Sequence, residues 1–124
     1  MIARITLCLA AAVLAGATLL AQTADMSGEW EVVYNPPSGH VNATLYIMQS
    51  GTTIKGNAET EGGEFPLSGS VNGKAFTISY TRPDGGRMVT TTYKGTADGD
   101  SMKDATAQLT GQDPVPLEGD RTSH

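Results

Sequence analysis

The chain has little cysteine, few aromatic residues (6%) and no long apolar run beyond its first 24 residues. Its one cysteine, Cys8, lies in an apolar, Ala- and Leu-rich segment that predicts a secretory signal over 1–24, with cleavage near Ala21 or Ala24. We therefore predict a secreted or periplasmic protein whose mature part, 25–124, forms no disulfide. Strand pairing and a packed core must then hold that part together.

Positive charge is scarce as well. All 13 acidic residues lie in 25–124 against seven basic ones, since Arg4 is the eighth, so the expected mature net charge is −6. Without a basic cluster, nucleic acid and anionic membrane surfaces are not expected partners. No further apolar run in 25–124 predicts a membrane span. The remaining length suits one compact domain and not two.

Groups that carry catalysis or bind metals are also few. The predicted mature chain has only His40, beside a turn, and His124, the last residue. Two histidines without thiolates do not predict a zinc site, and no serine has a histidine in register. We interpret Asp98, Asp100 and Asp104 as an acidic turn rather than a calcium site. The sequence therefore predicts no catalytic residues, no metal, no cofactor and no enzyme activity.

The turn signals after residue 27 divide the chain into eight short strands. The expected strands are 28–34, 40–49, 52–60, 64–71, 74–81, 87–96, 101–109 and 115–121. Three two-residue turns, at Ser50-Gly51, Asn72-Gly73 and Asp98-Gly99, alternate with four longer loops, at 36–39, 61–63, 83–86 and 111–114. No segment has a helical apolar period longer than two turns, and 15 glycines suit a turn-rich all-β chain.

Successive turns of an up-and-down meander fall at opposite ends of the sheet. We therefore predict an eight-stranded antiparallel barrel, closed or nearly closed, with the four longer loops at one end, the mouth, and the tight turns at the other, the floor. A two-sheet sandwich is the competing all-β fold. It would need a longer crossover than any connection here.

Period-2 alternation gives each strand an apolar and a polar face. A transmembrane barrel of this size would carry its apolar face outside, whereas we expect this one to carry it inside. The residues expected to point inward are Trp30, Val32, Tyr34, Val41, Ala43, Leu45, Ile47, Ile54, Ala58, Phe65, Leu67, Val71, Phe76, Ile78 and Tyr80.

Inward glycines recur in a repeat. Its copies are Ile54-x-Gly56-x-Ala58, Leu67-x-Gly69-x-Val71 and Tyr93-x-Gly95-x-Ala97. Glycine at these positions is expected to let the sheet bend sharply and the opposite wall approach.

The seventh strand has two interpretations. Extending the repeat turns Met102, Asp104, Thr106 and Gln108 inward. A bulge would instead turn Ala105, Ala107 and Leu109 inward and leave Asp104 in water. An unpaired inward carboxylate is costly, which favours the bulge; if Asp104 does point inward, it is the candidate functional charge.

The first and last strands carry a family resemblance. Gly28-Glu29-Trp30 resembles the G-x-W that opens the barrels of calycins, which include lipocalins, fatty-acid-binding proteins and avidins. Arg121, at the end of the last strand, resembles the lipocalin arginine that packs across that tryptophan. The resemblance implies a closed barrel whose floor is plugged by a Trp30–Arg121 cation–π contact. The repeated hairpins are also similar to those of small exported bacterial barrels.

The mouth collects the candidate ligand-binding residues, which are Tyr34, Val41, Phe65, Tyr80, Arg82 and Arg87. Arg82 and Arg87 flank the 83–86 loop and share the inward parity of their strands. Together they could hold a carboxylate or phosphate of a ligand whose apolar body enters the barrel. Alternatively, both arginines extend into water or pair with nearby acidic groups.

Two functions follow from this arrangement. The first is binding of a small, partly apolar and possibly anionic molecule at the mouth. The second is a fully packed barrel that acts as a protein-interaction or protease-inhibitor module without a small-molecule ligand, because eight strands enclose barely enough room for side chains.

Overall fold

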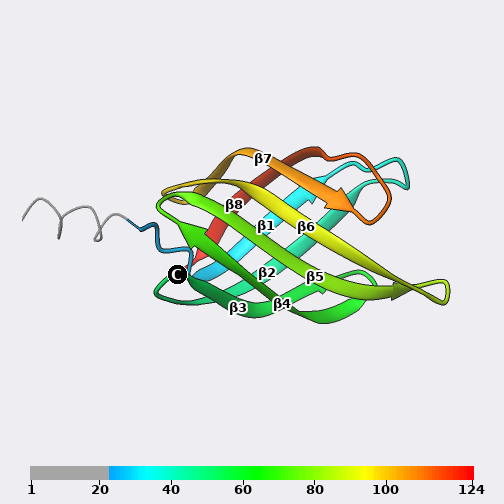
Figure 1. Cartoon of the computed structure of the whole chain (residues 1–124), viewed down its shortest axis with the longest axis horizontal. Coiled ribbons are helices and arrows are strands. Elements are labelled where there is room, and N and C mark those ends of the chain that lie inside the picture. The colour runs from blue at the N-terminus through cyan, green and yellow to red at the C-terminus, as the bar shows by residue number, and fades with distance from the viewer. Residues whose placement is uncertain (1–22) are drawn as a thin grey trace, which may run out of the picture.

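The computed structural model describes residues 23–124, so the predicted signal segment lies outside the described residues except for its last two positions. Each strand pairs antiparallel with the next, and β8 pairs with β1 (Figure 1). The predicted eight-stranded antiparallel meander barrel is confirmed, and it is closed. The strands are β1 (Gly28–Tyr34), β2 (Val41–Ser50), β3 (Thr53–Thr60), β4 (Gly63–Asn72), β5 (Ala75–Asp84), β6 (Arg87–Asp98), β7 (Ser101–Leu109) and β8 (Val115–Ser123).

Two of the four mouth connections are shorter than predicted. β3 and β4 are joined by residues 61–62 alone, and β5 and β6 by Gly85 and Gly86. Both of these glycines have positive φ, 60° and 84°, which closes a hairpin in two residues. The prediction of four long mouth loops is therefore wrong; only 35–40 and 110–114 are long.

Side chains fill the barrel interior. All the residues expected to point inward are buried, except Val41 and Phe65, which are half-buried near the mouth. The largest fully buried side chains include Trp30, Tyr93, Met26 and Leu45. The inward assignment is thus confirmed, and packing rather than a lipid-sized cavity occupies the centre. No helix within residues 23–124 has the length and apolarity needed to cross a membrane.

The repeat glycines allow neighbouring strands to approach closely. A Cβ at Gly56 would overlap the carbonyl oxygen of Tyr46 on β2, and a Cβ at Gly69 would overlap that of Thr77 on β5. The expectation that these glycines admit the opposite wall is therefore wrong. They permit the tight curvature of adjacent strands, which a small barrel requires.

Strand β7 contains the bulge. Its pairing with β8 shifts register between Met102 and Ala105, and Asp104 has a φ of 48° and is exposed. Met102 and Ala105 are both buried, because the one extra residue of the bulge shifts the inward parity of β7 by one position. The alternative with Asp104 as an inward functional charge is therefore wrong.

Candidate functional site

A hollow of about 240 Å³ opens at the mouth between the β1–β2 loop, the β3–β4 turn and β5. Four of the six predicted mouth residues line this mouth hollow, namely Tyr34, Val41, Tyr80 and Arg82. The other lining residues are His40, Asn42, Thr60, Glu61 and Gly62.

The mouth hollow exists because neighbouring hairpins separate at this end. Pairing between β2 and β3 begins only at Thr44 and Glu59, so β2 continues to the mouth without its partner. Pairing between β4 and β5 stops at Leu67 and Tyr80, although both strands continue. The next residue of β4 is Pro66, which has no N–H for the ladder. The β3–β4 hairpin therefore stands apart from both neighbours at its tip.

Two predicted mouth residues lie elsewhere. Phe65 stacks on the Tyr80 ring, with centroids 6.5 Å apart, and so supports the wall of the mouth hollow without lining it. Arg87 is exposed and pairs with Asp84 in the ladder at the tip of the β5–β6 hairpin. That hairpin extends past the other strands (Figure 1), so the shared inward parity of Arg87 and Arg82 does not bring Arg87 to the mouth hollow.

Three tyrosine hydroxyls form a chain beneath the mouth hollow. Tyr93 Oη donates to Tyr34 Oη at 3.3 Å, and the Oη atoms of Tyr80 and Tyr93 lie 3.0 Å apart. Each hydroxyl has one proton. Because the Tyr93 proton is directed to Tyr34, Tyr80 must donate to Tyr93. Tyr34 lies at the end of this chain and also lines the mouth hollow.

Tyr34 and Tyr93 stay protonated at neutral pH. Burial raises the pKa of Tyr34 well above its usual 10, and the charge and hydrogen bonding of Tyr80 add to this, while the nearby Arg82 charge partly opposes it. Burial raises the pKa of Tyr93 as well, with contributions from Tyr80 and Tyr34. The hydroxyls are therefore hydrogen-bond donors, and not anions, at neutral pH.

Arg82 presents an uncompensated charge to the mouth hollow. It is half-buried on the inward face of β5, opposite Val89. Within residues 23–124 its guanidinium forms neither a hydrogen bond nor an ion pair with another residue. Together with the Tyr34 hydroxyl, it makes this wall of the mouth hollow rich in donors.

The opposite wall is held by local hydrogen bonds. Thr60 Oγ1 accepts from Gly62 N at 3.1 Å and donates to the Gly63 carbonyl at 3.1 Å, which ties the β3–β4 turn. In the β1–β2 loop, His40 Nδ1 lies 2.8 Å from Asn35 Oδ1. Since an amide oxygen only accepts, His40 Nδ1 carries the proton. Both segments are therefore held by hydrogen bonds within the chain.

Sequence reasoning missed the residues of this wall. Alternation assigns Asn42 to the outer face, and Glu61 and Gly62 belong to a turn. They line the mouth hollow because it extends into the gap between separated hairpins. In that gap the strands are not paired, so side-chain alternation does not tell which residues face the hollow. In the sequence, only Pro66 indicated this separation, because proline lacks the N–H that strand pairing requires.

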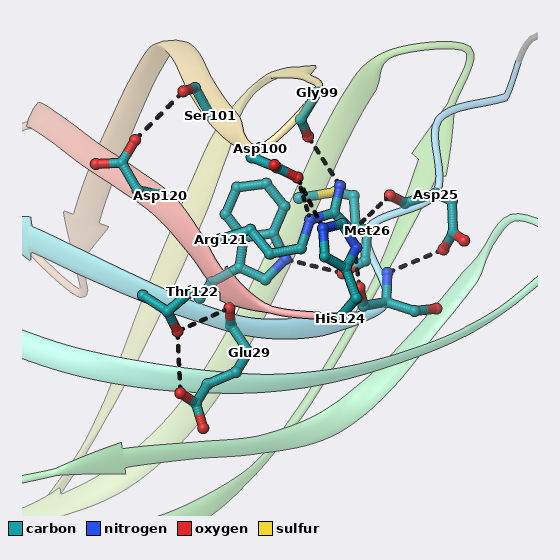
Figure 2. Close-up of polar contacts among 12 residues, drawn as sticks. Asp25, Met26, Glu29, Gly99, Asp100, Ser101, Asp120, Arg121, Thr122 and His124 are labelled. Atoms are coloured by element: carbon teal, nitrogen blue, oxygen red, sulfur yellow. Dashed lines mark hydrogen bonds and ion pairs between the residues drawn. The ribbon is translucent and has the colours of Figure 1, made fainter.

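At the floor, Arg121 packs over Trp30. Figure 2 shows the hydrogen bonds of Arg121 to Gly99 and Asp100. The guanidinium carbon lies 4.8 Å from the ring centroid, and only 7% of the Arg121 side chain is exposed. Trp30 Nε1 donates to the Met26 carbonyl at 2.8 Å. The Arg121 nitrogens donate to Asp100 Oδ1 at 2.9 Å and to the carbonyls of Asp25, Ser27 and Gly99 at 3.0, 2.7 and 2.8 Å. This floor plug engages all three guanidinium nitrogens in hydrogen bonds within the chain.

The segment before β1 is part of the floor. Ala24 N donates to the Gly73 carbonyl at 2.7 Å, and Gln49 bonds both the Ala24 carbonyl and Met26 N at 2.8 Å. Met26 is fully buried. Cleavage after Ala24 would remove the Ala24 bonds, whereas cleavage after Ala21 would retain them.

The acidic turn beside the floor is engaged in ion pairs. Asp98 lies 3.4 Å from Lys103 Nζ, and Asp100 contacts both Arg121 and His124, the latter at 3.3 Å. In the described part of the chain, no three His, Cys, Asp or Glu side chains are grouped so that they could hold a metal ion.

Comparison of the chain with protein-family models, with curated proteins and with solved structures gave no match. What the structure establishes is the architecture: an all-antiparallel, closed, eight-stranded meander barrel with a filled interior, a plugged floor and a hollowed mouth.

Proposed function

We propose that this protein binds a small, partly apolar molecule with an anionic or strongly accepting head group in the mouth hollow. The observation that carries the proposal is that Arg82 is half-buried and lines the mouth hollow together with Tyr34, while its guanidinium has no partner within residues 23–124. Charge-assisted hydrogen bonds from a guanidinium are among the stronger polar contacts in proteins. The Tyr34 hydroxyl adds a neutral polar group beside it.

The size of the mouth hollow limits the ligand. Sites for drug-sized molecules usually enclose about 300–1,000 Å³, and this one encloses about 240 Å³. Because the interior below it is filled, a lipid chain has no room to enter. The apolar body of the ligand would rest on Val41 and on the Tyr80 ring, which Phe65 supports from behind.

Binding accounts for these groups better than catalysis does. A general base needs a pKa near the working pH, and burial moves those of Tyr34 and Tyr93 away from it. His40 has its Nδ1 proton directed to Asn35. We therefore propose a secreted or periplasmic binding protein without a cofactor. The Trp30–Arg121 contact supports a calycin-like relationship within this proposal.

The second candidate is a packed barrel that binds another protein through its surface. The filled interior favours it, as do three large apolar side chains exposed outside the barrel, Tyr46 (37%), Met48 (69%) and Met88 (64%). Tyr46 and Met48 share the outward face of β2, while Met88 lies on the projecting β5–β6 hairpin. Such exposed residues can serve an interface or self-association.

A binding titration with a matched variant pair separates the two candidates. We expect 3-phenylpropionate to bind the purified protein in calorimetry and to lose about tenfold or more in affinity for Arg82→Gln, because the charged head loses its partner. Arg87→Gln removes the same charge from the hairpin tip and should bind like the parent. Equal affinities for both variants would contradict the site. No binding of any small acid, with a partner protein captured and lost on Met48→Ser, would favour the second candidate.

A further inference from the structure

The mouth hollow contains a negative charge as well as a positive one. Glu61 lines it from the β3–β4 turn, whereas Arg82 lines it from β5. Within the described chain, the Glu61 carboxylate has no cationic partner, and it does not pair with Arg82. Two opposite charges therefore share one small hollow and lie too far apart for a direct ion pair.

The two charged residues lie on different backbone elements. Glu61 belongs to the turn that the Thr60 hydroxyl ties at both sides. Arg82 belongs to β5, which remains paired with β6. No ladder joins β4 to β5 beyond Leu67, so the β3–β4 tip does not close onto Arg82. The two charged residues therefore belong to backbone elements that no ladder joins at the mouth.

The polar groups of the mouth hollow are thus segregated. On the β1 and β5 side lie the donors, which are the Tyr34 hydroxyl and the Arg82 guanidinium. On the β3–β4 side lies an acceptor, the Glu61 carboxylate. A ligand with an anion alone would leave Glu61 unpaired close to its own negative charge, which is unfavourable. A molecule that carries both charges would satisfy both walls.

We propose that the mouth hollow binds a small zwitterion with an apolar side chain, of the size of an aromatic amino acid. Its carboxylate contacts Arg82 and the Tyr34 hydroxyl, its ammonium contacts Glu61, and its apolar group rests on Val41 and Tyr80. This inference rests on the proposed function and specifies the class of ligand.

Three probes that share one phenyl body test the inference by calorimetry on the purified protein. They are phenylalanine, with both charges, 3-phenylpropionate, with only the carboxylate, and 2-phenylethylamine, with only the ammonium. We expect phenylalanine to bind up to about fivefold more tightly than 3-phenylpropionate, as suits an ion pair with the exposed Glu61. Glu61→Gln should abolish this advantage and should not weaken 3-phenylpropionate.

Glu64→Gln is the matched control, because Glu64 is an exposed acid on the same hairpin that does not line the mouth hollow. It should preserve the advantage of phenylalanine. If 3-phenylpropionate binds as tightly as phenylalanine and Glu61→Gln changes neither, the zwitterion is overturned while an anion site at Arg82 stands. If none of the three probes binds, or if 2-phenylethylamine binds best, both the inference and the proposed function are overturned.

Discussion

Each end of the barrel holds one inward arginine near an aromatic ring, and the two arginines differ in every other respect. The Arg121 side chain at the floor is almost wholly buried and lies over Trp30. It donates hydrogen bonds to Asp100 and to three backbone carbonyls. Arg82 at the mouth is half-buried and has no such partners among residues 23–124. The difference teaches that internal hydrogen-bond and ion-pair partners, and not residue type, separate a structural arginine from one without partners in residues 23–124.

The two ends differ because their backbones differ. At the floor, the segment 23–27 crosses beneath the barrel, and the 99–100 turn supplies carbonyl and carboxylate acceptors to Arg121. At the mouth, the hairpins end at different heights and separate. An arginine placed there meets open space rather than backbone carbonyls.

The largest expected effect is at the floor. Trp30→Ala should lower the free energy of unfolding by about 3–5 kcal/mol, because it removes a fully buried ring and the Nε1 bond to Met26. Urea denaturation monitored by circular dichroism measures this change. A loss below about 1 kcal/mol would show that the floor plug does not hold the barrel together.

An intermediate effect distinguishes the two arginines directly. Arg121→Gln should cost about 2–4 kcal/mol of unfolding free energy, because it removes the cation–π contact with Trp30 and four charge-assisted hydrogen bonds. Arg82→Gln should change it by less than about 0.5 kcal/mol. The same denaturation curves test both variants. Similar losses of unfolding free energy in the two variants would contradict the conclusion that Arg121 is structural and Arg82 is not.

The smallest effect at neutral pH is that of the buried tyrosines beneath the mouth hollow, which make the stability depend on pH only under alkaline conditions. The folded-state pKa values of Tyr34 and Tyr93 are raised, so above pH 10 the unfolded chain releases protons that the folded chain keeps. Stability should therefore fall as pH rises above about 10, by up to about 1.4 kcal/mol per pH unit for each tyrosine, and should be unaffected by these groups at neutral pH.

Tyr93→Phe is the control for this pH dependence. It removes one buried hydroxyl and should make the alkaline slope of the unfolding free energy shallower. An unchanged slope in Tyr93→Phe would mean that the buried tyrosines do not cause the alkaline loss.

The fold was largely predictable because alternation and turn chemistry are local signals. The bounds of β1 and β7 match those expected, and the bulge followed from the cost of burying Asp104. The lengths of two mouth connections were not predictable in this way. A stretch such as 83–86 has the composition of a loop, but the positive φ of Gly85 and Gly86 extends the ladder to Asp84 and Arg87.

The mouth hollow was predictable only in part. Parity placed Tyr34, Tyr80 and Arg82 correctly on the inner face, because parity is a property of each strand. It also placed Arg87 with them, although β5 and β6 carry Arg87 beyond the barrel. Glu61 and His40 were missed since they lie in connections, for which parity has no meaning.

The amino-acid sequence by itself determined the number of strands, their inner and outer faces and the all-β class, because these depend on period-2 alternation and on residues that favour turns. Only the tertiary structure decided where the hairpins separate, which arginine is satisfied and which charges share the mouth hollow. Those features depend on how far each strand continues past its neighbour. That extent is set by the pairing register of all eight strands around the closed barrel, and not by the sequence of any one strand.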